Sequence, residues 1–99
     1  MLDASREAVA FTSGCTRASL DGNRMLCLSL VRCIEIVGEA ASKITSGTRE
    51  RYSNIPWPEI VAMRNRLIHA YFDIDLDRVW DTVNDDLPPL MLQLEQLVS

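Results

Sequence analysis

The chain has 99 residues and a net charge of −4, with 47% hydrophobic and 24% charged residues. This length suits one domain, spanning residues 1–99, of a size at which oligomerisation often supplies extra buried surface. The acidic balance argues against a protein that coats nucleic acid nonspecifically, because such binding depends on many Lys or Arg contacts to phosphate. The longest apolar runs are too short to cross a membrane.

The N-terminus and the cysteines favour a cytoplasmic protein. The segment Met1 to Glu7 carries charge where a signal peptide needs an apolar core. Cys15, Cys27 and Cys33 are odd in number and form no C-x-x-C pair, and one histidine cannot complete a multi-histidine zinc site. We therefore expect free thiols that mostly pack in the core, no metal site and no membrane contact.

The apolar pattern of the first half predicts helices. Leu2 to Phe11 forms a short helix that should end near Ser13-Gly14. From about Asp21 to Ile44, apolar residues recur at spacings of three and four and draw one continuous stripe, made of Met25, Leu28, Val31, Ile34, Val37, Ala41 and Ile44. This is the longest helix that we expect, and no segment alternates strongly enough to predict a strand.

Two further helical regions follow. After breakers at residues 46–48 and 54–56, a third helix starts near Pro58 and is expected to run to about Tyr71. Asp73 or Asp75 can cap the next helix, which Pro88-Pro89 should kink or split. The sequence thus predicts an all-α, up-and-down bundle of four to five helices, which we expect to be dimeric.

The segment from Arg64 to Tyr71 carries the most suggestive chemistry, because the only histidine, His69, lies between arginines and a tyrosine. On a helix, Arg64 would fall in the middle of the apolar stripe. Asn65 and His69 would lie about 100° and 140° away, four residues apart and toward the polar side.

A guanidinium at that position needs a partner. An unpaired buried charge is costly, so Arg64 should meet a carboxylate inside the bundle or point into a cleft or a subunit interface. Glu35 and Glu39 on the long helix are the candidate partners. On spacing alone, however, a lone histidine is usually a surface or packing residue, and the sequence predicts only a bundle with one polar cluster.

The segment also reads R-x4-H-x-Y, from Arg64 through His69 to Tyr71, and it resembles the signature of HepT-like toxins, small helical members of the HEPN superfamily of ribonucleases. Other blocks resemble the family in the same order along the chain. They are Arg32 to Ala41, Ile55-Pro56-Trp57, Asp75 to Trp80, and Asp86-Leu87-Pro88. The stretch from Gly14 to Asn23 departs most from the family pattern.

The resemblance implies a metal-independent endoribonuclease, the toxin of a type II toxin-antitoxin (HEPN/MNT) system, acting on RNA as a homodimer with a shared cleft. His69 would serve as general base or acid when the RNA 2′-hydroxyl attacks the adjacent phosphate, and Arg64 would stabilise the phosphoryl charge. Asn65 and Arg66 would support the site by positioning the imidazole or the RNA.

The resemblance also implies regulation at Tyr71. Its partner would be an MNT-type nucleotidyltransferase antitoxin, which would transfer AMP from ATP to Tyr71. The adenylyl group beside Arg64 would occupy the place of the substrate phosphate and silence toxicity. The nucleotide is then a substrate of the partner, so no cofactor is expected on this chain.

A second hypothesis is a noncatalytic helical interaction module that binds and regulates a nucleotidyltransferase. Its support is the small size and the acidic balance. Residues 43–72 hold five basic and two acidic side chains, whereas residues 73–99 hold seven acidic ones and a single arginine. The acidic tail suits either a solvated face or a basic partner. A binding module should tolerate His69→Ala with its complex intact.

Overall fold

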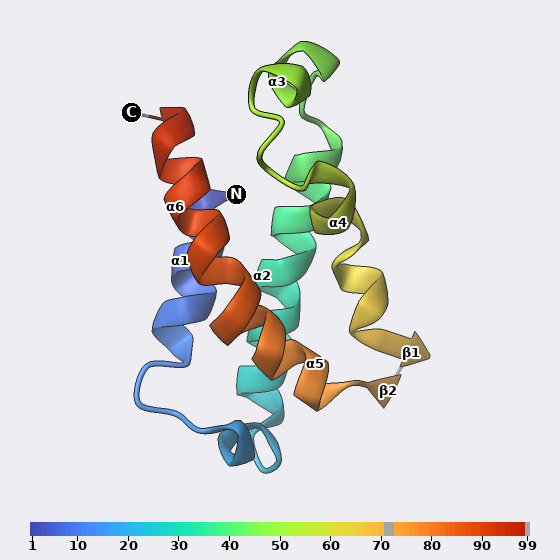
Figure 1. Ribbon diagram of the computed structural model, residues 1–99. Helices are drawn as coiled ribbons and strands as arrows, with labels where there is room; N and C mark the ends of the chain where they lie inside the picture. Colours follow the sequence, from blue (N-terminus) through green and yellow to red (C-terminus); the bar gives the residue numbers. More distant parts are fainter. Residues whose placement is uncertain (71–72, 99) are drawn as a thin grey trace.

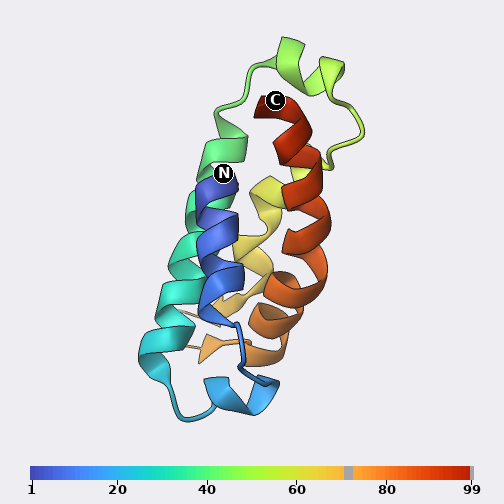
Figure 2. The same ribbon diagram turned by 90° about the vertical axis from the view of Figure 1, so that its left-hand side faces the viewer.

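The computed structural model describes residues 1–70 and 73–98, with residues 68–70 and 98 described by their backbone alone. The fold is all-α, as expected. Helix α2 (Arg24–Ser42) packs against α1 (Leu2–Phe11) and against α4 (Trp57–Ala62) (Figure 1). Helix α6 (Leu87–Val98) packs against α1, which lies between α2 and α6 in Figure 2.

Helix α1 and the start of α2 form where the sequence predicts them. Gly14 follows α1 with a φ of 76°, a left-handed conformation that favours glycine. A 3-10 turn, η1 (Arg17–Leu20), leads to Asn23, whose side-chain oxygen accepts a hydrogen bond from the Leu26 amide and caps α2. The three cysteines are free thiols, and burial raises the pKa of both Cys27 and Cys33.

The buried face of α2 differs from the predicted stripe at its first turns. Met25 and Leu28 are 80% and 44% exposed, so their assignment to the core was wrong. The buried residues of this helix are Cys27, Leu30, Val31, Cys33, Ile34, Val37, Gly38 and Ala41. The core face is therefore rotated toward Cys27 and Leu30, because packing against α1 selects that side of the helix.

The third helix is much shorter than predicted. A short helix, α3 (Ser46–Arg51), precedes α4, which ends at Ala62 rather than near Tyr71. A 3-10 turn, η2 (Arg64–Arg66), follows, and the chain then enters a strand, β1 (Ile68–Ala70), antiparallel to β2 (Asp73–Ile74). The expectation of no strand was thus wrong at this one hairpin, whose connecting residues 71–72 lie outside the described residues.

Tertiary pairing explains why no helix continues beyond Leu67. The Asp75 amide donates a hydrogen bond of 2.7 Å to the Leu67 carbonyl, and Ile68 pairs with Ile74. Leu67 is fully buried, which anchors the turn to the core. The backbone groups that would form hydrogen bonds in a longer helix form them in this hairpin instead.

The last helical region is continuous but irregular. Asp75 caps α5 (Leu76–Asp81) by accepting from the Arg78 amide, as one of the two predicted caps. A π-helical turn, η3 (Thr82–Asp86), then joins α5 to α6, with Pro88-Pro89 in the first turn of α6. The expected break near the prolines is therefore a π turn just before them. In the described part of the chain, no helix is long and apolar enough to span a membrane.

Candidate functional site

The side chains of Arg64 and Asn65 line a groove between α2 and the α4–η2 segment. The groove has a volume of about 340 Å³, and its other lining residues are Arg32, Glu35, Gly38, Glu39, Ser42 and Val61. It therefore gathers residues from positions 32–42 and 61–65, which are far apart in the sequence.

Arg64 meets one of its two predicted partners. Its Nε atom donates a hydrogen bond of 3.3 Å to Oε1 of Glu35, and the side chains are 50% and 29% exposed. Because α4 ends before Arg64, this arginine does not lie on a buried helical stripe, and that part of the angular prediction was wrong. The expectation offered a carboxylate inside the bundle, a cleft or a subunit interface as alternatives; the structure shows a partly exposed pair with Glu35 at a groove.

Glu35 is shared by two arginines. Its second oxygen, Oε2, accepts from Nη1 of Arg32 at 3.5 Å, while Oε1 accepts from Arg64. Sequence reasoning missed Arg32 as a member of this cluster, although the spacing of three residues between Arg32 and Glu35 is one that pairs side chains on a helix. Glu39, the other candidate, instead pairs with Lys43 at 3.4 Å.

The terminal nitrogens of Arg64 remain available at the groove. The ion pair uses Nε, and Nη1 and Nη2 make no hydrogen bond to the described residues. A guanidinium held at one edge in this way is oriented yet still presents two donors to a phosphate oxygen.

Gly38 sets the distance between the two walls. A Cβ atom at this position would lie 3.2 Å from the Ile60 carbonyl oxygen and 3.5 Å from that of Val61. Both oxygens belong to the backbone of α4, so they cannot move away as the end of a flexible side chain could. The glycine therefore permits the close approach of α2 and α4 that brings Arg64 to Glu35.

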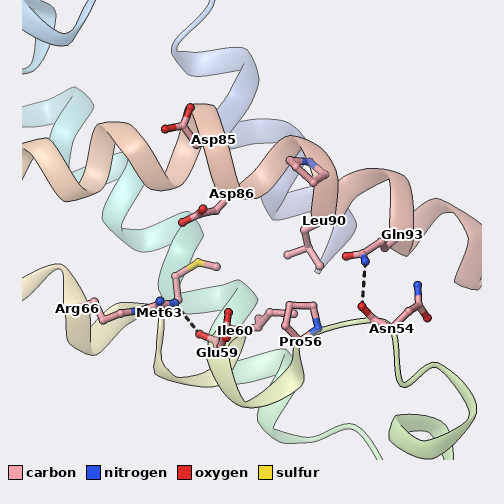
Figure 3. Close-up of a pocket in the computed structure, with 11 residues that line it drawn as sticks. Asn54, Pro56, Glu59, Ile60, Met63, Arg66, Asp85, Asp86, Leu90 and Gln93 are labelled. Atoms are coloured by element: carbon pink, nitrogen blue, oxygen red, sulfur yellow. Dashed lines mark hydrogen bonds between the residues drawn. The ribbon is translucent and has the colours of Figure 1, made fainter.

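Arg66 lies on the other flank of the α4–η2 segment. Its Nη2 atom donates to the Glu59 carbonyl at 2.8 Å, and the side chain lines a second cavity, toward η3 and α6 (Figure 3). The structure thus brings Arg64 and Asn65 together and places the side chain of Arg66 away from them.

His69 follows Arg64 along the chain but not on the same helix. The backbone of His69 lies in β1, so the predicted helical pairing of Asn65 with His69 was wrong. Tyr71 lies outside the described residues. Among the described residues, no three histidine, cysteine or acidic side chains gather as metal ligands would.

Comparison with known proteins supports a nuclease family. Residues 1–97 match the family model described as "Ribonuclease HepT-like". Two Methanocaldococcus jannaschii proteins named as candidate RNases are similar to the chain. One is 35% identical over 95 residues, which are 96% of this chain and 87% of the relative, and the other is 33% identical over 99 residues, all of this chain and 82% of the relative.

A third relative carries a more specific name. The "Probable ribonuclease HepT" of Thermococcus cleftensis is 41% identical over 69 residues, which are 70% of this chain and 63% of the relative. No solved structure matches the chain significantly.

Proposed function

Because the chain belongs to the HepT-like ribonuclease family and is an RNA-cleaving enzyme, we propose that it is a metal-independent endoribonuclease toxin that uses Arg64 and His69. The observation that carries this proposal is the state of Arg64. It is half-exposed at a groove, held at Nε by Glu35, with its terminal nitrogens directed to no described side chain. An ion pair with a purely structural role would not need to lie at a groove.

The chemistry needs one proton-transfer group and one group that stabilises charge. The RNA 2′-oxygen loses its proton and forms a bond to the adjacent phosphorus, while the bond from phosphorus to the 5′-oxygen breaks and that oxygen gains a proton. His69 would serve as base or acid in these transfers, and Arg64 would bind the phosphoryl oxygens as their charge grows. Asn65 lines the same groove and would position the RNA. Arg66, on the other flank, would support the site only indirectly.

We propose that the working unit is a homodimer whose groove is completed by the second copy. An exposed apolar strip made of Phe11, Met25, Leu28 and Ile36, between 36% and 80% exposed, lines a hollow next to the groove, and the exposed Val61 lines the groove itself. Arg32 lies at the junction, because it lines both the hollow beneath this strip and the Arg64 groove. Contiguous apolar surface of this kind is typical of subunit contacts.

Tyr71 is the proposed site of silencing. The motif places it two residues after His69, and the family resemblance implies an MNT-type nucleotidyltransferase antitoxin that would attach AMP to its hydroxyl. An added phosphodiester carries negative charge and would compete with RNA phosphate for Arg64. Intact mass before and after incubation with such a partner and ATP measures this step directly.

The test of the catalytic proposal is RNA cleavage in EDTA by purified protein that intact mass shows to be unmodified. Arg64→Ala and His69→Ala should each abolish cleavage while remaining folded. Arg6→Ala is a matched control, because Arg6 is 52% exposed and pairs with Glu95 at 3.4 Å, much as Arg64 pairs with Glu35. Absence of cleavage by every form, on total RNA and on tRNA, would instead favour the noncatalytic interaction module.

A further inference from the structure

The second cavity, on the Arg66 flank, has no part in the chemistry proposed above. It has a volume of about 370 Å³ and lies between the α4–η2 segment and the η3–α6 segment (Figure 3). That is within the size range of ligand sites and is enough for one or two side chains. We therefore asked what chemistry its lining would accept.

The floor of the cavity is apolar. Ile60, Met63 and Leu90 are each 4% exposed or less, and Pro56 and Pro89 extend the apolar lining. At one end, the Gln93 side-chain amide donates to the Asn54 carbonyl at 3.1 Å and closes the cavity. A ligand in this cavity would therefore place its apolar part against these side chains.

The rim of the cavity is acidic. Glu59, Asp85 and Asp86 line it, against the single cation Arg66. Asp86 points into the cavity above Met63 and Arg66 in Figure 3, yet it forms no ion pair with any described residue. The Nη2 atom of Arg66 donates a hydrogen bond to the Glu59 carbonyl and not to a carboxylate. The cavity therefore holds three carboxylates and one guanidinium around an apolar floor.

Asp86 is exposed at the rim, but partial desolvation disfavours its charged form. Desolvation raises the pKa of Asp86, Arg66 opposes the effect, and Asp85 adds to it. A cation placed beside Asp86 would offset the net negative charge of the rim, whereas an RNA phosphate would meet the excess of acidic groups. The acidic rim thus favours a cationic ligand over an anionic one.

We propose that this cavity is a docking site for a basic segment of a partner protein, with a lysine or arginine side chain lying along Met63 and Leu90 and its charge at Asp86. Such side chains are apolar along the stem and cationic at the tip, which matches the lining in the same order. The proposal does not depend on RNA cleavage, because it concerns the opposite flank of α4.

The test is a titration of the isotopically labelled full chain, followed by the backbone amide resonances. The probe is the capped peptide acetyl-Leu-Lys-Leu-amide, and its neutral match is acetyl-Leu-Gln-Leu-amide. The lysine peptide should move the resonances of residues around Asp86 and Leu90 and should bind about threefold or more tightly than the glutamine peptide, the gain expected for one partly exposed ion pair.

Two variants locate the contact. Asp86→Asn should remove the preference for lysine, whereas Asp3→Asn, the same change on the exposed first turn of α1, should keep it. Unchanged spectra away from the substitution show that each variant is folded. The proposal is overturned by equal binding of the two peptides, by no shifts with either, or by shifts at the Arg64 groove only. It is also overturned if a non-cleavable 2′-O-methyl oligouridylate, rather than the lysine peptide, moves the cavity resonances.

Discussion

Arg64 and Arg66 are two residues apart and carry the same guanidinium group, but their hydrogen-bond partners and surroundings differ. Arg64 pairs with the Glu35 carboxylate across to α2, at a groove whose wall it forms. Arg66 donates to a backbone carbonyl within its own segment, at a cavity with a surplus of carboxylates. The 3-10 turn that carries both sends one side chain to each flank of α4. Local backbone geometry, and not residue type, therefore assigns one arginine to the proposed phosphate site.

The strongest test of this difference is catalytic. Arg64→Ala should lower kcat/KM for RNA by about 100-fold to 1,000-fold, as expected for loss of a donor that stabilises transition-state charge, whereas Arg66→Ala should cost about tenfold or less. Steady-state cleavage of one fluorescent RNA by both variants measures the ratio. Equal losses would mean that the two flanks do not differ in function.

The role of Glu35 in orienting Arg64 can be tested separately from the effect of its negative charge. Glu35→Gln should lower kcat about tenfold, because Arg64 is no longer held in one orientation, and KM should not rise, because a carboxylate that competes with phosphate is gone. Glu39→Gln makes the same charge change in the same groove without touching Arg64, so its kcat should stay near the wild-type value. A similar fall in kcat for both variants would assign the effect to charge alone.

The close contact on the Arg64 flank should show in stability. Gly38→Ala places a methyl group against the Ile60 carbonyl and should lower the free energy of unfolding by about 1–2 kcal/mol. Gly47→Ala, in α3 with nothing within 4 Å of its added Cβ, should raise it by a few tenths of a kcal/mol, roughly the helix preference of alanine near a helix end. Urea unfolding of both variants gives the comparison.

The smallest expected effect is on the Arg66 flank and depends on pH. The pKa of Asp86 is higher in the folded chain than in the unfolded chain, so folding is favoured when Asp86 is protonated, and this stability is lost as pH rises through the raised pKa. Asp86→Asn should therefore become more stable than the wild type as pH rises from the ordinary carboxylate range toward neutrality. The groups that act on Asp86 are retained in this variant, namely Arg66, Asp85, Arg78 and Asp81. A stability difference that does not vary with pH would contradict the assignment.

Much of the fold follows from local sequence. The stop after Phe11, the caps at Asn23 and Asp75 and the early position of Pro58 in its helix depend on a few neighbouring residues. The core face of α2 was harder to predict, because Cys27 and Leu30 compete with Met25 and Leu28 for the buried side, and only packing against α1 decides between them.

Two of the residues predicted for the site, Arg64 and Asn65, line one groove, but the shape of the segment that carries them was not predicted. The sequence indicated Glu35 as one of two possible partners of Arg64, although the observed pair is partly exposed and not buried. The turn from η2 into β1 could not be predicted, because it depends on the Asp75 amide bonding to the Leu67 carbonyl, eight residues away, after the chain has turned back. Helical angles carried past that point gave wrong neighbours for Asn65 and His69.

The exposed apolar strip also has a consequence for oxidative chemistry. Met25 is 80% exposed, whereas Met63 is 4% exposed, and peroxide attacks accessible thioethers first. An uncovered chain would take its first sulfoxide at Met25 and so acquire a polar group within the strip, in the first turn of α2. A second copy seated there would shield the sulfur. The rate of Met25 oxidation thus reports whether the strip is covered, and the sulfoxide itself would weaken that contact.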